Sequence, residues 1–256
     1  MQRRRFIQLT AGATIVMPVL ARAEAHGGDT FDTPAGPVTV HPVQHASFVM
    51  ETPAGMIYVD PVGGAEAYAD LPPPDLILVT HEHGDHYDEQ TLAGIGQNAV
   101  PIIVNPAVRD MLPEPLAATA TAIANGESTE ALGLTIDAIP AHNLTEDRLN
   151  FHPPGRDNGY VVNLEGFRVY VSGDTEDVPE MRALEDIDLA FVCMNLPFTM
   201  DAETAADAVR AFAPGAVYPY HYRGRDGGTQ DPEAFAEMVG DASEVLMGNW
   251  YPEGLG

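Results

Sequence analysis

Thr80-His81-Glu82-His83-Gly84-Asp85-His86 directly follows the apolar run Asp75-Leu76-Ile77-Leu78-Val79, and this stretch decides how the chain is interpreted. Three imidazoles and the carboxylate of Asp85 lie where a buried strand would end. Both groups are ligands that zinc-like divalent ions prefer. In an extended segment residues i and i+2 point the same way, so His81 and His83 can bind one ion. Gly84 permits a sharp turn, after which Asp85 and His86 can face a second ion.

The composition indicates an acidic globular enzyme. The chain has 256 residues, of which 45% are hydrophobic, and this size and content favour one large domain. There are 38 acidic residues against 12 basic ones, all of them arginine, for a net charge of -26. Such a charge repels phosphate backbones and anionic lipid, so nucleic acid and membrane surfaces are not expected partners. The single cysteine, Cys193, lies in an apolar run and is interpreted as a buried structural thiol.

The N-terminal segment resembles an export signal. Arg3-Arg4-Arg5-Phe6 precedes an uncharged apolar stretch over residues 9–20, and Ala21-Arg22-Ala23 has the small-x-small pattern of a cleavage site. We therefore expect a twin-arginine-type signal at residues 1–23, a single domain at residues 24–256, and a periplasmic or secreted protein. Cleavage would remove four arginines and no acid, which leaves a net charge of -30. A permanent membrane anchor is the alternative, but the apolar stretch is short for a membrane span.

Hydrophobic patterning predicts a layered α/β fold. Each half of the chain begins with β-hairpins and continues with alternating strands and helices, which fits two sheets packed face to face with helices outside. Among the helices we expect one that Asp88 caps and Gly96 ends, one at residues 106–111, one at residues 199–212 and one at residues 232–239.

Further ligand candidates follow other predicted strands. His142, Asp174 and His221 each come directly after a β segment, and functional groups on α/β scaffolds gather at such strand ends. A lone histidine after a strand is more often a solvated loop residue than a ligand. The ordered combination of His-x-His-x-Asp-His with the three later residues is what points to a metal centre.

Together these motifs resemble the metallo-β-lactamase superfamily, over a region from about Val38 to Val239. The Asp60-Pro61 turn, the motif at residues 80–86, Ser172-Gly173-Asp174-Thr175 and Pro219-Tyr220-His221-Tyr222 are similar to the branch that includes ascorbate-6-phosphate lactonase. The resemblance implies a four-layer αββα sandwich. It also implies that His81, His83 and His142 bind the first metal, that Asp85, His86 and His221 bind the second, that Asp174 bridges them, and that Asp60 orients a ligand imidazole.

This resemblance implies hydrolysis. Two divalent ions, zinc first with manganese or iron as alternatives, would share a hydroxide that attacks a carbonyl or phosphoryl centre of a small molecule. Asp85 could also accept a proton, and His45 resembles a position near the active site, so both are candidate catalytic residues. Glu82 should point away from the metals, and His41 and His152 are interpreted as loop or surface residues. Arg223 and Arg225 could anchor a substrate carboxylate or phosphate.

Three functions remain open at this stage. The first is an exported dinuclear hydrolase that cleaves a lactone, ester, amide or phosphoester. The second is a mononuclear iron dioxygenase of the same fold. Redox members of the superfamily that use two irons tend to have glutamate where this chain has His83, so two-iron redox chemistry is not expected. The third is a non-catalytic metal-containing binding protein, which a complete ligand set disfavours. Fold alone does not indicate β-lactamase activity.

Overall fold

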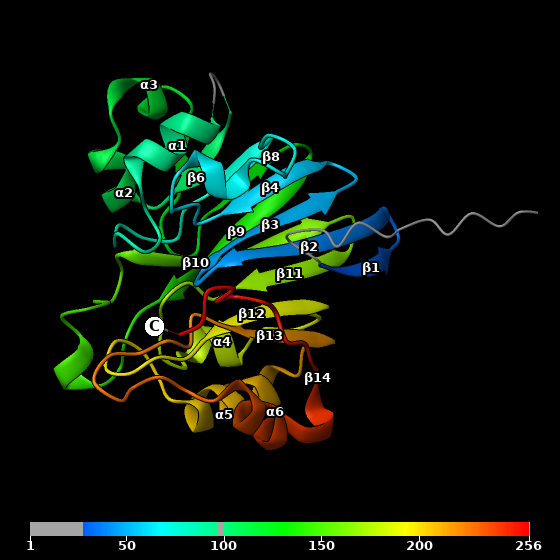
Figure 1. Cartoon of the computed structure of the whole chain (residues 1–256), viewed down its shortest axis with the longest axis vertical. Coiled ribbons are helices and arrows are strands. Elements are labelled where there is room, and N and C mark those ends of the chain that lie inside the picture. The colour runs from blue at the N-terminus through cyan, green and yellow to red at the C-terminus, as the bar shows by residue number, and fades with distance from the viewer. Residues whose placement is uncertain (1–27, 97–99, 256) are drawn as a thin grey trace, which may run out of the picture.

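The computed structural model describes residues 28–96 and 100–255 (Figure 1). The expected export signal at residues 1–23 and the start of the expected domain lie outside these residues. Within them, no helix combines the length and the apolar character needed to cross a bilayer.

The first half of the chain forms a seven-stranded sheet in the order β1-β2-β3-β4-β5-β6-β7. Its first four strands pair antiparallel and its last strands pair parallel. The turn Thr52-Pro53-Ala54-Gly55 closes the hairpin of β3 and β4, as predicted. The strands are β1 (Asp29–Thr33), β2 (Gly36–Gln44), β3 (Ser47–Thr52), β4 (Gly55–Val59), β5 (Leu76–Leu78), β6 (Ile102–Val104) and β7 (Ala120–Ala122).

The second half repeats this layout. Its sheet has the order β14-β13-β12-β11-β10-β9-β8, with antiparallel pairing among β8 to β11 and parallel pairing from β11 to β14. The strands are β8 (Ser128–Ala131), β9 (Leu134–Ala141), β10 (Asp157–Leu164), β11 (Phe167–Val171), β12 (Leu189–Cys193), β13 (Ala216–Tyr220) and β14 (Glu244–Val245). The sequence analysis did not predict β1, β7, β8 or β14, which are short or exposed and carry little hydrophobic pattern.

The two sheets pack face to face around the main hydrophobic core. Phe48 on β3 stacks on Phe191 on β12 with ring centroids 4.0 Å apart, and both side chains are fully buried. A second core lies under α1 and α2, where Ile77 and Leu92 are buried together. Figure 1 shows α1, α2 and α3 beyond one sheet and α5 and α6 beyond the other. This arrangement confirms the predicted four-layer αββα sandwich.

Polar capping side chains begin most of the α-helices. Asp88, Asn105, Asp201 and Asp231 each accept backbone N–H groups at the start of the next helix. The Asp201 cap places the first residue of α5 at Ala202, three residues later than predicted. The helices are α1 (Glu89–Ile95), α2 (Pro106–Met111), α3 (Glu114–Ala117), α4 (Pro179–Arg182), α5 (Ala202–Phe212) and α6 (Pro232–Val239), with 3-10 turns η1 (Ala65–Tyr68), η2 (Glu146–Arg148) and η3 (Gly240–Ala242).

Candidate metal centre

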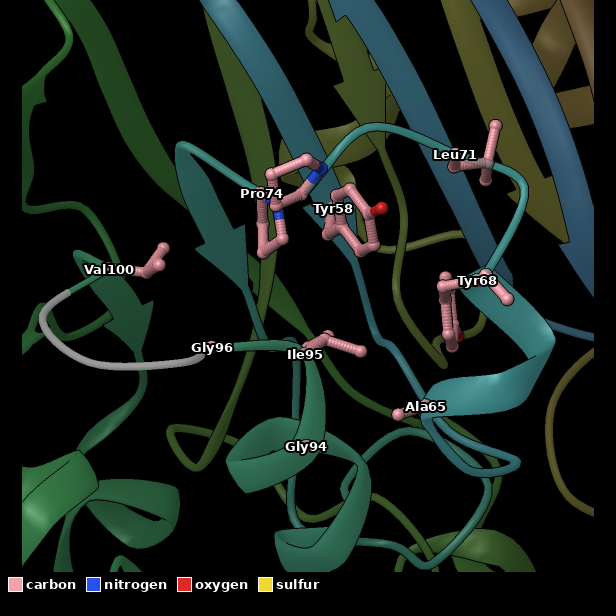
Figure 2. Close-up of a pocket in the computed structure, with 11 residues that line it drawn as sticks. Tyr58, Ala65, Tyr68, Leu71, Pro74, Gly94, Ile95, Gly96 and Val100 are labelled. Atoms are coloured by element: carbon pink, nitrogen blue, oxygen red, sulfur yellow. The ribbon is translucent and has the colours of Figure 1, made fainter.

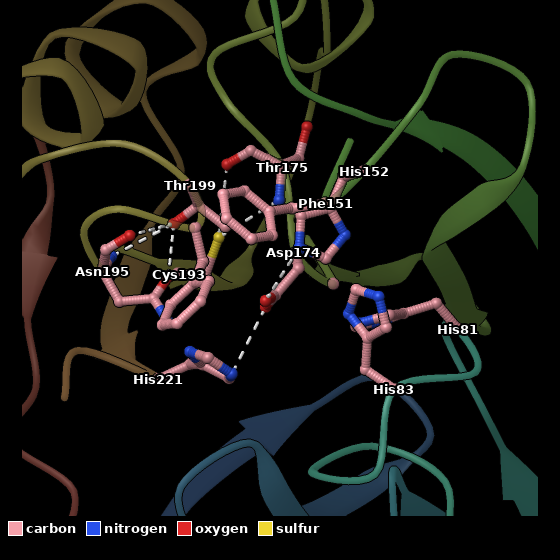
Figure 3. A network of polar contacts seen from close by, with 12 residues as sticks. His81, His83, Phe151, His152, Asp174, Thr175, Cys193, Asn195, Thr199 and His221 are labelled. Atoms are coloured by element: carbon pink, nitrogen blue, oxygen red, sulfur yellow. Dashed lines mark hydrogen bonds and ion pairs between the residues drawn. The ribbon is translucent and has the colours of Figure 1, made fainter. Parts of the chain in front are cut away.

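Loops from both sheets bring the predicted ligands to one edge of the sandwich. The segment after β5 carries His81, His83, Asp85 and His86, while Asp174 follows β11 and His221 follows β13. Figure 3 shows Asp174 between the imidazole of His221 and those of His81 and His83. Residues that are 140 positions apart in the sequence therefore meet only when both sheets are in place.

His81, His83 and His152 form the first group of potential ligand atoms. His81 Nε2 lies 3.1 Å from His83 Nδ1. The ring centroid of His152 lies 5.0 Å from that of His81 and 4.8 Å from that of His83. His81 and His152 are buried and His83 is half-buried. These three nitrogens can converge on one ion.

The structure places His152 in this group where the sequence analysis expected His142. His142 Nδ1 lies 3.0 Å from the carbonyl oxygen of Asn143, and His142 belongs to none of the ligand groups among the described residues. The chain leaves β9 at His142, loops outward, and returns so that the amide of Asn143 donates to the carbonyl of His152 over 2.8 Å. The sequence analysis considered only residues that follow strands, whereas His152 precedes β10. His152 lies in a loop, as expected, but its side chain is buried, and His41 is buried within β2.

Asp85, His86, Asp174 and His221 form the other side of the centre. His86 Nε2 and His221 Nε2 lie 3.4 and 3.5 Å from Asp174 Oδ1. His221 Nε2 also lies 3.3 Å from Asp85 Oδ2. On the opposite side, His152 Nε2 lies 3.4 Å from Asp174 Oδ2. Asp174 thus presents one oxygen to each half of the cluster.

These separations fit a cluster built to hold divalent ions. Ligand atoms at tetrahedral zinc bond lengths are separated by about 3.3 Å, close to the distances observed here. Such contacts are long for hydrogen bonds. Buried His86 Nε2 and Asp174 Oδ1 have no hydrogen-bond partner among the described residues, and leaving such atoms unpaired is costly. An ion would satisfy both.

Asp60 contacts His86 from outside the cluster, in the orienting position that the resemblance implied. Its Oδ2 lies 2.7 Å from His86 Nδ1, and it accepts hydrogen bonds from the Thr80 amide and hydroxyl. Ser47 donates to its carbonyl oxygen, which helps hold Asp60 in a left-handed conformation at φ 44. With Nδ1 of His86 occupied in this way, Nε2 faces the cluster.

Asp157 orients His152 as Asp60 orients His86, and the sequence analysis did not identify it. Asp157 Oδ2 lies 3.0 Å from His152 Nδ1, and Arg156 donates to the same carboxylate. Arg156 also pairs with Glu82 at 2.9 Å, so Glu82 is directed away from the cluster as predicted. The signal that could have found Asp157 is an acid at the start of a strand that is buried at all positions but one.

His45 lies against the cluster from the turn between β2 and β3. Its Nε2 lies 3.4 Å from Asp85 Oδ2, its ring centroid lies 3.7 Å from that of His221 with the two rings tilted, and its Nδ1 lies 2.7 Å from the hydroxyl of Tyr251. Both His45 and His221 have positive φ, at 51 and 49, a strained conformation that clusters at functional sites. The structure therefore places His45 beside the candidate ligands Asp85 and His221.

Burial and neighbouring charge set the protonation of these groups. Burial, reinforced by the His86 and His152 imidazoles, lowers the pKa of His81 well below its ordinary value. Burial and His221 lower the pKa of His45 to about 4. Burial alone would raise the pKa of Asp174, but His221 and His86 outweigh it and hold this pKa well below its usual range. Burial alone would lower the pKa of His86 and of His152, but neighbouring carboxylates outweigh it: Asp174 and Asp60 raise the pKa of His86 well above its ordinary value, and Asp157 and Asp174 raise that of His152 to about 9. His81 and Asp174 are therefore already in the forms that bind metal, whereas His86 and His152 would release a proton when an ion binds.

A cavity of ≈ 320 Å³ opens over the cluster. Its lining includes the candidate ligands His83, Asp85, Asp174 and His221 and the aromatic side chains of Phe151 and Phe198. A larger cavity of ≈ 540 Å³ lies between η1 and α1 and is lined by Tyr58 and Tyr68 (Figure 2). No ligand candidate lines this second cavity, so the chemistry belongs to the first.

Comparison with known proteins identifies the family. A family model described as the beta-lactamase superfamily domain matches residues 39–221. The chain belongs to the metallo-β-lactamase superfamily. A UPF0173 metal-dependent hydrolase of Thermococcus onnurineus is 33% identical over 177 residues, which cover 68% of this chain and 78% of the relative. Together with the ligand cluster, this relationship makes the protein a metal-dependent hydrolase.

Solved structures agree with this assignment. The crystal structure of a proposed metal-dependent hydrolase from Parabacteroides distasonis has a TM-score of 0.78 and 35% identity, and covers 88% of this chain and 100% of its own. Igni18, a metallo hydrolase from Ignicoccus hospitalis, has a TM-score of 0.68 and 23% identity over 82% of this chain and 94% of its own, and supports the fold alone.

Proposed function

We propose that this superfamily member is an exported hydrolase that binds two divalent ions and cleaves a lactone, ester, amide or phosphoester bond in a small molecule. The ligands are divided between the two ions. His81, His83 and His152 bind the first, Asp85, His86 and His221 bind the second, and Asp174 bridges them. His152 takes the place that the sequence analysis gave to His142.

The orientation of Asp174 is the observation that carries this proposal. Its Oδ2 is 3.4 Å from His152, whereas its Oδ1 is 3.4 Å from His86 and 3.5 Å from His221. A carboxylate that served one ion would not need its two oxygens directed at separate imidazole sets. The histidine-rich donor set favours zinc, with manganese or iron as alternatives.

Two divalent ions, when bound, supply an activated water and polarise the substrate's carbonyl or phosphoryl oxygen. The chain's own residues position the remaining groups. Asp85 is half-exposed and lines the cavity, so its carboxylate can accept a proton from the attacking water. His45 holds Asp85 in place through Nε2 and is itself oriented by Tyr251. Both residues therefore act in the proposed reaction.

Residues outside the described region support the proposed location. The three arginines before Phe6, the apolar stretch at residues 9–20 and the Ala21-Arg22-Ala23 site are typical of a twin-arginine signal, which exports folded proteins with their metals. The net charge of -26 favours a small-molecule substrate over nucleic acid or anionic membrane. Among small molecules, the lactonase-like motifs make lactones the first class to test.

A hydrolysis screen of the metal-loaded mature protein tests the proposal. Lactones, carboxylic esters, phosphodiesters and acyl amides are offered in turn, and each hit is repeated with His81→Ala and His221→Ala. We expect one class to be hydrolysed by the wild type and by neither variant. Full activity in both variants would refute the site assignment, and oxygen uptake in place of hydrolysis would favour an iron dioxygenase.

A further inference from the structure

A third cavity adjoins the metal centre. It measures ≈ 450 Å³ and shares Asp85 and His45 with the catalytic region. Its other walls come from the loop after β13, through Arg223, and from the C-terminal segment at residues 250–254. Because Asp85 lines both cavities, a molecule seated here can extend to the ligand cluster.

Arg223 gives this cavity its positive charge. Within the described part of the chain, Arg223 pairs with no carboxylate, although acidic residues outnumber basic ones by about three to one. Most other described arginines are paired, including Arg148 with Glu176 and Arg225 with Asp226, while Arg109 and Arg168, which also lack an ion pair, are only partly exposed. An exposed guanidinium left without a carboxylate in so acidic a chain is available to an anionic ligand.

The guanidinium of Arg223 is also held in place. It lies 5.1 Å from the centre of the Tyr251 ring, and the Arg223 backbone amide donates to the Tyr251 hydroxyl over 3.0 Å. The same hydroxyl contacts His45, so Tyr251 ties the arginine to the catalytic region. A guanidinium over an aromatic face keeps its N–H edge free for the two oxygens of a carboxylate.

The remaining walls limit the kind of anion. Val43, Val62 and Trp250 provide apolar surface, which suits a short hydrocarbon body. Glu253 lines the same cavity and would repel a dianion more strongly than a monoanion. The cavity therefore suits a carboxylate better than a phosphate dianion.

We propose that the cavity around Arg223 binds the carboxylate of the substrate, so that the enzyme acts on small, singly charged carboxylate-bearing molecules whose scissile bond reaches the metal centre. This inference rests on the proposed hydrolysis for its catalytic part only. Carboxylate binding by Arg223 can be measured without turnover.

Trp250 provides the readout, because it is the only tryptophan in the chain and lines this cavity. Metal-loaded mature protein is titrated with pentanoate and with its uncharged analogue 2-hexanone while indole fluorescence is recorded. Neither probe can be hydrolysed. We expect saturable binding of pentanoate and at least tenfold weaker binding of 2-hexanone, a ratio on the order expected for one charge-assisted contact.

Arg223→Gln and Arg225→Gln form a matched pair, since each removes one positive charge from the same loop. We expect Arg223→Gln to weaken pentanoate binding on the order of tenfold and Arg225→Gln to leave it near the wild-type value. Equal effects of both substitutions would overturn the proposal. Binding that survives Arg223→Gln and disappears in His81→Ala would also overturn it, because the carboxylate would then sit on the metals. Failure of hydrolysis with these binding results intact would count against the proposed function alone.

Discussion

In the first half of the chain, β4 is followed directly by Asp60, and in the second half the equivalent strand, β11, is followed after two residues by Asp174. His86 lies between these two acids, with Nδ1 2.7 Å from Asp60 and Nε2 3.4 Å from Asp174. Asp60 is fully enclosed and its oxygens accept from Thr80, whereas Asp174 Oδ1 has no hydrogen-bond partner among the described residues. Equivalent positions in the repeated layout thus serve different purposes. One acid orients a ligand, and the other is left available to bind metal.

The largest effect should come from Asp174. Asp174→Asn keeps the size of the side chain and removes the charge and one acceptor oxygen, so we expect turnover to fall to background and bound metal to decrease. The measurement is steady-state hydrolysis together with metal content by mass spectrometry, with circular dichroism to establish folding. A folded variant that retains wild-type turnover would contradict the bridging role.

The next comparison sets His152 against His142. We expect His152→Asn to lose metal and turnover, because its Nε2 faces Asp174 and its Nδ1 is held by Asp157. His142→Asn should leave both close to wild type, since the His142 side chain is half-buried and contacts Asn143. The same assays measure both variants. Loss of metal and turnover in His142→Asn but not in His152→Asn would instead support His142 as the ligand, as the resemblance implied.

Asp60→Asn should have an intermediate effect. The amide can still accept from Thr80, but it no longer supplies a charge to His86 Nδ1, and loss of such an orienting acid costs about 10–100-fold in metal affinity or activity. Metal affinity is measured by competition with a chromogenic chelator. A loss as complete as that of Asp174→Asn would show that the two acids have the same role.

A buried tyrosine in each half of the chain allows the two halves to be compared by their free energy of unfolding. Tyr58 on β4 donates its hydroxyl to the carbonyl of Pro72 over 2.6 Å, whereas the hydroxyl of Tyr170 on β11 is buried with no partner among the described residues. We expect Tyr58→Phe to lower the free energy of unfolding by about 1 kcal/mol, and Tyr170→Phe to leave it unchanged or raise it. Urea unfolding of both variants measures this difference. Equal losses would argue against the hydrogen-bond assignment.

The smallest effect concerns alkaline pH. Burial raises the pKa of Tyr58 from 10.0 to about 12, so the folded state favours the neutral phenol. This contribution to stability is complete below pH 10.0 and is lost as the pH rises through about 12. The stability difference between wild type and Tyr58→Phe should therefore shrink over this range. A difference that stays constant between these pH values would contradict the assignment.

Much of the fold and half of the site could be predicted because the signals were local. The motif at residues 80–86 combines ligands with strand-end position, and the helix cap at Asp88 follows from side-chain chemistry. His152 and Asp157 could not be found in this way. Their roles depend on how a loop returns between β9 and β10, which is set by the contact between Asn143 and His152. Tyr251, which contacts His45, lies 206 residues further along the chain, so no sequence spacing indicates the pair.

Metal stoichiometry of the purified mature protein tests the central claim most directly. If Asp174 bridges two ions, the wild type should contain two divalent ions per chain, and His152→Asn and His221→Asn should each lose a different one. One iron per chain, accompanied by oxygen uptake and no hydrolysis, would contradict the account.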